Sequence, residues 1–171
     1  MRETGTIGEF LNGWTKKHRT MLRFIRAGDV FCFTRNDGTY FFGQIISKIL
    51  CGHSAQIFDV QHDQPTLDAG QLVRASRLMQ PIVLDSYSLF DRKSDVDSDW
   101  RIVGRHEVID AQNAEQHFFV YGAPGSWTKV NAGNSIECPA SEMEAKSLSP
   151  LTPLNNFKVW LAIDAIQRTG S

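Results

Sequence analysis

A hairpin signature in the first third of the chain constrains its fold most strongly. Residues 28–45 contain two apolar runs rich in Phe, Tyr and Val, separated by Asn36, Asp37 and Gly38. Asp-Gly pairs supply the positive φ angles that tight hairpin turns need, and aromatic and β-branched residues favour strands. The stretch therefore predicts two antiparallel strands joined by a short turn.

The side chains of this hairpin predict how its strands are covered. In the first strand, Val30 and Cys32 alternate with Phe31 and Phe33, so both faces are expected to be at least partly buried. Gly43 lies inside the second, longer strand. A glycine inside a strand often marks a bulge or bend, so we expect the sheet to curl there.

Further β-favouring segments predict additional strands. They lie at residues 55–60, 81–84 with 88–90, 100–104, 116–121 and 127–130. A short helical turn is expected near 71–78. Residues 131–153 are rich in Asn, Ser, Pro and Gly, which predicts an irregular connection.

Helical patterns are found at both ends of the chain. Residues 6–9 fit a capping box ahead of an apolar stripe that extends to Trp14. Near the C-terminus, Thr152 fits an N-cap and Pro153 a first helical position. Because a wide apolar stripe follows, we expect a helix over about 153–168 that docks on the sheet.

These patterns together predict an α+β fold. We expect a curled, mainly antiparallel β-sheet with an N-terminal and a C-terminal helix packed on it. The 171 residues suit one domain, spanning 1–171, and 42% hydrophobic with 22% charged residues is typical of soluble globular proteins. The chain has no apolar run of ~18 residues and no signal-like apolar start, so we expect it in the cytoplasm.

No group of residues in the sequence predicts catalysis, a cofactor or a metal. The chain has no Gly-x-Ser-x-Gly elbow and no Gly-x-x-x-x-Gly-Lys phosphate loop. Cys51 and His53 offer two zinc ligands, whereas a structural zinc site needs four. We therefore expect no catalytic residue, no bound metal and no cofactor.

An acidic segment precedes the strand predicted at 100–104. Asp95, Asp97 and Asp99 alternate as at the start of a calcium loop, but Trp100 and His106 occupy its required Gly and Glu positions. We therefore expect no helix–loop–helix calcium site. A looser cation site, a solvated loop and a surface that meets a basic partner remain alternatives.

A basic segment gives a second charged region. Lys16, Lys17, Arg19, Arg23 and Arg26 follow one another without an intervening acid. Such a segment favours either a solvated connector or a surface that binds nucleic acid or an acidic partner. The net charge of −1 argues against a general polyanion binder, and we expect no direct nucleic-acid or membrane contact.

Four short motifs share their order and spacing with a known family. They are Gly28-Asp29-Val30-Phe31, Asp37-Gly38-Thr39-Tyr40 with Gly43, Asp85-Ser86-Tyr87, and Trp100-Arg101-Ile102-Val103-Gly104. Over roughly residues 24–122 the chain resembles the immunity protein 26 family of bacterial polymorphic toxin systems. The resemblance implies a small cytoplasmic, non-enzymatic protein that binds and neutralises a cognate toxin domain in bacterial competition. The motif residues look architectural, so none is carried over as a binding residue.

Charge complementarity with the toxin that the resemblance implies suggests where a partner would bind. Many such toxins are nucleases, whose active sites are usually basic, so an acidic inhibitor face is expected to occlude them stoichiometrically. The expected partner-binding residues are Asp91, Asp95, Asp97, Asp99 and Trp100, with Asp63 and Asp68 as a second group. A core position is an alternative for Trp100.

A different functional class is a small-molecule hydrolase, phosphotriesterase-like, on a β scaffold. Such an enzyme needs a concave pocket with convergent His, Asp or Cys side chains. The sequence lacks the paired metal-binding histidines that this chemistry ordinarily uses. A toxin-binding protein is therefore the favoured interpretation.

Overall fold

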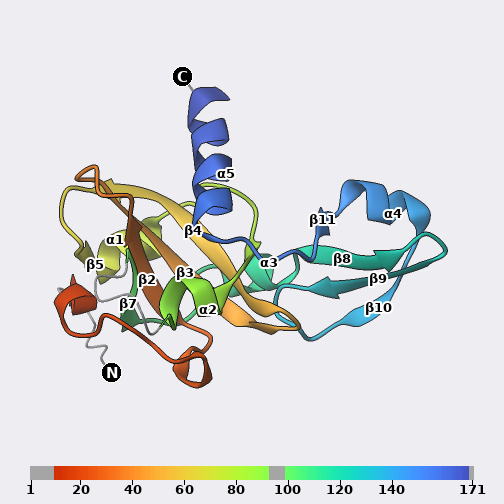
Figure 1. The fold of residues 1–171 in the computed structure, drawn as a ribbon, viewed down its shortest axis with the longest axis horizontal. Coiled ribbons are helices and arrows are strands. Elements are labelled where there is room, and N and C mark those ends of the chain that lie inside the picture. Colours follow the sequence, from red (N-terminus) through yellow and green to blue (C-terminus); the bar gives the residue numbers. More distant parts are fainter. Residues whose placement is uncertain (1–9, 93–98, 170–171) are drawn as a thin grey trace.

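The computed structural model describes residues 10–92 and 99–169 of the chain (Figure 1). Among these residues the largest sheet, called the main sheet, has the strand order β6-β4-β3-β2-β7, and every neighbouring pair is antiparallel. Its strands are β2 (Asp29–Thr34), β3 (Tyr40–Ile49), β4 (Gly52–His62), β6 (Ile82–Leu84) and β7 (Trp100–Arg105).

Two smaller sheets accompany the main sheet. The second sheet has the order β10-β9-β8-β11, with a parallel β8–β11 pair, and β1 pairs antiparallel with β5. These strands are β1 (Phe10–Leu11), β5 (Leu67–Asp68), β8 (Phe118–Ala123), β9 (Ser126–Asn131), β10 (Glu137–Ala140) and β11 (Ser149–Pro150). The predicted α+β class and mainly antiparallel pairing are confirmed.

Most of the helices are short. They are α1 (Ala69–Arg74), α2 (Ser86–Phe90), α3 (Ala111–Glu115), α4 (Glu142–Ser147) and α5 (Asn156–Thr169), with 3-10 turns η1 (Gly13–Thr15) and η2 (Leu22–Phe24). Helix α5 begins at the main sheet and its C-terminal end extends away from it, whereas α4 lies beside the far end of the second sheet (Figure 1).

The predicted hairpin is present as β2 and β3. Thr34 is paired with Tyr40, which leaves a five-residue connection in between. Asn36 and Gly38 carry the positive φ angles of 64° and 84°, so Asn36, and not Asp37, accompanies the glycine in this role. The Asp37 carboxylate instead accepts a hydrogen bond from the Thr39 amide at 3.0 Å, which fixes the turn.

Gly43 lies at the predicted irregularity. The register between β3 and β4 shifts between Phe41 and Gly43. A Cβ at position 43 would lie 2.3 Å from Cζ of Phe31 and 2.7 Å from the carbonyl oxygen of Gln56. The absent side chain therefore lets the Phe31 ring cross directly over the strand.

The N-terminal helix is not found among the described residues. Residues 6–9 of the expected capping box lie outside them, and Phe10–Leu11 forms β1 instead. Leu11 is buried and pairs with Leu67. The backbone of Gly13 packs closely against the backbone of Val103, because a Cβ at position 13 would lie 2.6 Å from the Val103 carbonyl oxygen. Tertiary pairing thus overrides the weak local helical pattern.

Two other local predictions were wrong. Ser88–Phe90 belongs to α2, whose N-cap Asp85 accepts a hydrogen bond from the Ser88 amide. The segment expected to be irregular holds β10, α4 and β11, where Ser141 and Glu144 form a reciprocal capping box. In both places a side-chain N-cap starts a helix that the amino-acid composition did not indicate.

Helix α5 starts later than its predicted beginning near 153. The Asn155 side chain accepts a hydrogen bond from the Lys158 amide at 3.0 Å, as an N-cap does, so Thr152 and Pro153 lie before the helix. Val159, Trp160 and Ile163 of α5 are buried against the main sheet.

Three hydrophobic clusters hold these layers together. Phe31 and Phe33 point to the face covered by α2 and α5, whereas Val30 and Cys32 point to the opposite face, which confirms the predicted alternation. A third cluster joins the two sheets and contains Ile46, Ile49, Val83, Ala114, Phe119, Val130 and Ala132. Both faces of the main sheet are therefore occupied by the fold itself.

Replacing Gly43 tests the close approach of Phe31. In Gly43→Ala the added Cβ clashes with the Phe31 ring and with the carbonyl oxygen of Gln56, so both must move away from position 43. The free energy of unfolding is therefore expected to fall by about 1–3 kcal/mol. Gly70→Ala in α1 is the matched control, because the nearest atom there belongs to the flexible Arg74 side chain, and alanine favours helices. Urea unfolding measures both, and equal stabilities for the two variants would contradict the argument.

Candidate functional site

Three acidic residues lie at one end of the main sheet. Asp63 directly follows β4, Asp37 lies in the β2–β3 connection, and Asp99 directly precedes β7. The pairings Tyr40 with His62, Thr34 with Tyr40, and Phe33 with Trp100 put all three at the same end. We call this group (Asp37, Asp63 and Asp99) the acidic end. With neighbouring strands ~4.8 Å apart, it crosses four strands and about 14 Å.

The acidic end brings together residues from both sequence-predicted groups. Asp63 is exposed and Asp99 is half-buried, and the Asp99 carbonyl accepts a hydrogen bond from the Thr34 amide. Asp95 and Asp97 lie outside the described residues. Asp68 has a structural task, since its carboxylate accepts from the Gly70 amide and completes the N-terminal capping box of α1.

Asp91 and Trp100 lie inside the fold, with only 8% and 2% of their surfaces exposed. The Asp91 carboxylate pairs with Arg19 at 2.6 Å and accepts from the Leu22 amide, so it anchors the basic connector to the end of α2. Trp100 stacks on Phe33 with ring centroids 4.0 Å apart. Both residues were expected at the surface, but their side chains lie inside the fold and hold it together. For Trp100 this agrees with the alternative of a core position.

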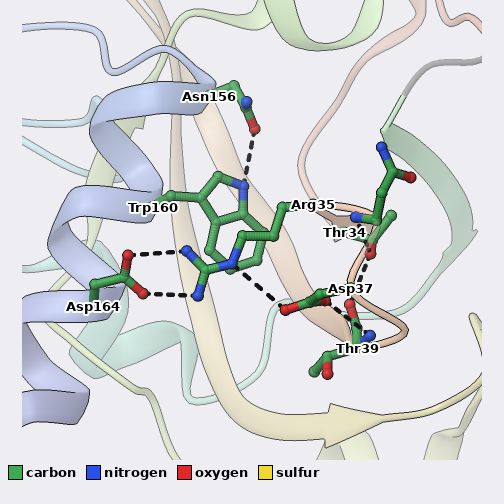
Figure 2. A network of polar contacts seen from close by, with 8 residues as sticks. Thr34, Arg35, Asp37, Thr39, Asn156, Trp160 and Asp164 are labelled. Carbon is green, nitrogen blue, oxygen red and sulfur yellow. Dashed lines mark hydrogen bonds and ion pairs between the residues drawn. The ribbon is translucent and has the colours of Figure 1, made fainter.

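Arg35 connects the acidic end to α5 (Figure 2). Its guanidinium makes two hydrogen bonds to the Asp164 carboxylate, at 2.8 and 2.9 Å, and its Nε lies 3.6 Å from an oxygen of Asp37. Its Cζ lies 4.4 Å above the Trp160 ring, as in a cation–π contact. Hydrogen bonds from Arg35 hold the pKa of Asp164 below its ordinary value, and the charge of Arg35 adds to this.

Asn156 completes this junction from the first turn of α5. Its side-chain oxygen accepts hydrogen bonds from the indole nitrogen of Trp100 at 2.8 Å and from that of Trp160 at 3.0 Å. Figure 2 shows the Trp160–Asn156 bond beside the stacked Arg35. The two indoles therefore fix the position of the helix, and the hairpin turn is bonded to Asp164, one turn beyond Trp160.

The basic segment is largely engaged within the fold. Arg19 is paired with Asp91, while Lys17 and Arg23 lie over the Phe24 ring at 5.9 and 4.9 Å. The Arg26 amide bonds to the Asp29 carboxylate. These contacts are those of a connector that wraps the sheet.

A cavity with a volume of about 780 Å³ lies beside β4 and α1. Its lining includes Arg77 and Asp110, which face each other at 3.5 Å, and Gln56, whose side-chain oxygen accepts from Arg77. Arg77 also donates to Asn113 at 2.7 Å. Arg77 and Asp110 thus link the connection after β7 to the sheet, and none of the described residues that line the cavity is a histidine or a cysteine.

The buried His53 and the half-buried His117 occupy separate positions in the fold. His53 of β4 contacts the Ser86 hydroxyl at 2.7 Å, and His117 packs edge-on against the Phe119 ring. Burial lowers the pKa of both imidazoles. Within residues 10–92 and 99–169, no three His, Cys, Asp or Glu side chains gather closely enough to hold a metal ion. The convergent site that the hydrolase alternative requires is not formed by these residues.

The comparison with protein families decides the assignment. A family model described as immunity protein 26 matches residues 26–129, which is more than half of the chain. The chain belongs to the immunity protein 26 family. No curated protein and no solved structure is significantly similar to it.

The matched region corresponds to a definite part of this immunity protein. It contains all five strands of the main sheet and the acidic end, and it ends within β9. Helices α4 and α5 lie beyond it. In the part of the chain that the structure describes, no helix is long and apolar enough to cross a membrane.

The Arg35–Asp164 pair gives a pH-dependent prediction for this immunity protein. A lowered pKa means that the ion pair stabilises the fold above the ordinary aspartate pKa of about 3.9 and that this contribution is lost as the pH falls through the folded value. Asp164→Asn should therefore lower the melting temperature by about 1–4 °C at pH 7 and much less at pH 3.

The matched control is Asp59→Asn, which changes an exposed aspartate of β4. It should leave the melting temperature within about 1 °C of wild type at both pH values. Scanning calorimetry measures these differences. A loss for Asp164→Asn that is equal at pH 7 and pH 3 would refute the ionic contribution.

Proposed function

We propose that this protein neutralises its cognate toxin by covering a basic face of the toxin with the acidic end of the main sheet, and that the toxin is a nuclease. Family membership indicates the toxin-neutralising immunity role itself. The observation that supports the surface is the convergence of Asp37, Asp63 and Asp99 at one sheet end. In the sequence, Asp95 and Asp97 come shortly before Asp99 and add two further carboxylates to this segment.

The charge of the surface supports the class of toxin. Enzymes that act on nucleic acids present Lys and Arg side chains to phosphates, so their substrate-binding faces are basic. A row of carboxylates on the inhibitor complements such a face, attracts it over about a Debye length and excludes the substrate once bound. The inhibition is stoichiometric because it requires occupation of the face and no chemical step.

The fold supports a binding role over an enzymatic one. The acidic residues lie on connections between strands, while the strands beneath them are fixed by the buried aromatic cluster. Binding residues are commonly carried in this way by loops on a rigid scaffold. We also propose the cytoplasm as the place of encounter, since that is where a nuclease delivered by a competing cell meets nucleic acid.

Co-expression tests the proposed function. Cells that express the toxin domain encoded by the adjacent gene are expected to stop growing, and expression of this protein in the same cells should restore growth. A pull-down should recover both proteins in a 1:1 ratio. Equal killing with and without this protein, despite normal expression of both chains, would exclude the immunity role.

Charge neutralisation tests the surface. In Asp37→Asn/Asp63→Asn, both changed residues are exposed, and asparagine keeps the oxygen that Asp37 offers to Thr39. The association rate with the toxin should fall by about 3- to 10-fold at low salt, and its salt dependence should weaken. Stopped-flow fluorescence measures both quantities.

A matched control removes the same charge from another part of the molecule. Glu107→Gln/Asp110→Asn changes two exposed acids of the connection that follows β7, beyond the opposite end of the main sheet. Its association rate is expected to stay within about twofold of wild type. Equal slowing in the two double variants would show a general charge effect and would remove the acidic end from the interface.

A further inference from the structure

Helix α5 exposes two large apolar side chains that the fold does not use. Phe157 is 68% exposed and Leu161, one turn later, is 52% exposed. The buried side of the helix is supplied by Val159, Trp160 and Ile163, which belong to the aromatic cluster of the main sheet. Packing on the sheet therefore gives no reason for the apolar character of positions 157 and 161.

The two side chains share a helical side with Asp164. Residues three and four apart are neighbours on a helix surface, which lines up Phe157, Leu161 and Asp164, with Arg168 one turn further. Asp164 holds the bidentate Arg35, and Arg35 also approaches Asp37 (Figure 2). The apolar pair therefore lies on the same helical side as Asp164, and Asp164 is connected through Arg35 to Asp37 of the acidic end.

The same contacts hold this side of α5 in one orientation. Arg35 stacks on Trp160 while bonding to Asp164, and Asn156 bonds to two indoles. A surface that is fixed before binding loses little conformational freedom when a partner arrives. Exposed apolar groups rimmed by charged residues are a common mark of protein interaction sites.

We propose that Phe157 and Leu161 are the apolar anchor by which this protein recognises its own toxin, docking into an apolar pocket on the toxin beside the basic face that meets the acidic end. This inference rests on the proposed function, since the toxin is the partner. The acidic end lies inside the family-matched region, whereas α5 lies beyond it. In this proposal the main sheet supplies the charge and α5 supplies the apolar contact.

The test is Phe157→Ala/Leu161→Ala, with binding to the purified toxin domain of the adjacent gene measured by surface plasmon resonance. Because both side chains are exposed, the melting temperature should stay within about 2 °C of wild type. The Kd should rise at least tenfold, mainly through faster dissociation, as expected for central apolar contacts. The salt dependence of association should be unchanged, in contrast to the acidic-end variant.

The matched control is Ile136→Ala/Met143→Ala, which removes two other exposed apolar side chains, 50% and 80% exposed, one directly before β10 and one in α4. Its Kd should stay within twofold of wild type. Equal weakening in both double variants, or no weakening in the α5 variant, would overturn the anchor. Toxin binding by the wild-type protein would still support the proposed function in either case.

A second copy of the chain is the competing occupant of this helix side. Light scattering after size-exclusion chromatography should give a monomer for the wild type at about 50 μM and for the α5 variant. A wild-type dimer that Phe157→Ala/Leu161→Ala converts to monomer would assign the side chains to self-association and overturn the toxin anchor. Failure of the wild type to bind the toxin at all would instead reject the proposed function.

Discussion

Phe33 stacks on Trp100 at a centroid distance of 4.0 Å, and Trp160 packs against Phe33 and Phe41 at 5.2 and 5.3 Å. This aromatic junction joins the β2–β3 hairpin to β7 and α5, which lie far from the hairpin in the sequence. Asn156 satisfies the indole nitrogens of both tryptophans, so their burial leaves no unpaired donor there. The acidic end and the exposed side of α5 both depend on this junction for their positions.

The junction explains how charge and apolar surface can coexist at one end of the molecule. The carboxylates of the acidic end lie on connections that leave the sheet, where solvent screens their mutual repulsion. Arg35 reduces that repulsion further because it faces both Asp37 and Asp164. In the proposed complex, the charges supply long-range attraction, and Phe157 and Leu161 supply short-range fit. Binding proteins commonly divide on-rate and affinity between such groups.

Local patterns in the sequence predicted the strands of the hairpin and the bulge at Gly43, because side-chain alternation and glycine act over a few residues. The predicted N-terminal helix is not found among the described residues, where Leu11 is buried and paired in β1 and residues 13–15 form a 3-10 turn. For the candidate site, the acidic character of positions 63 and 99 was visible in the sequence. The burial of Asp91 and the Arg35–Asp164 pair were not, because their partners lie 72 and 129 residues away.

Hydrogen–deuterium exchange on the complex tests the central claim most directly. Binding of the toxin domain encoded by the adjacent gene should slow exchange in residues 35–39, around Asp63 and Asp99, and along the exposed side of α5. The amides of α4 and β10 should exchange as in the free protein. Slowed exchange confined to the second sheet, with residues 35–39 and α5 unchanged, would contradict the account.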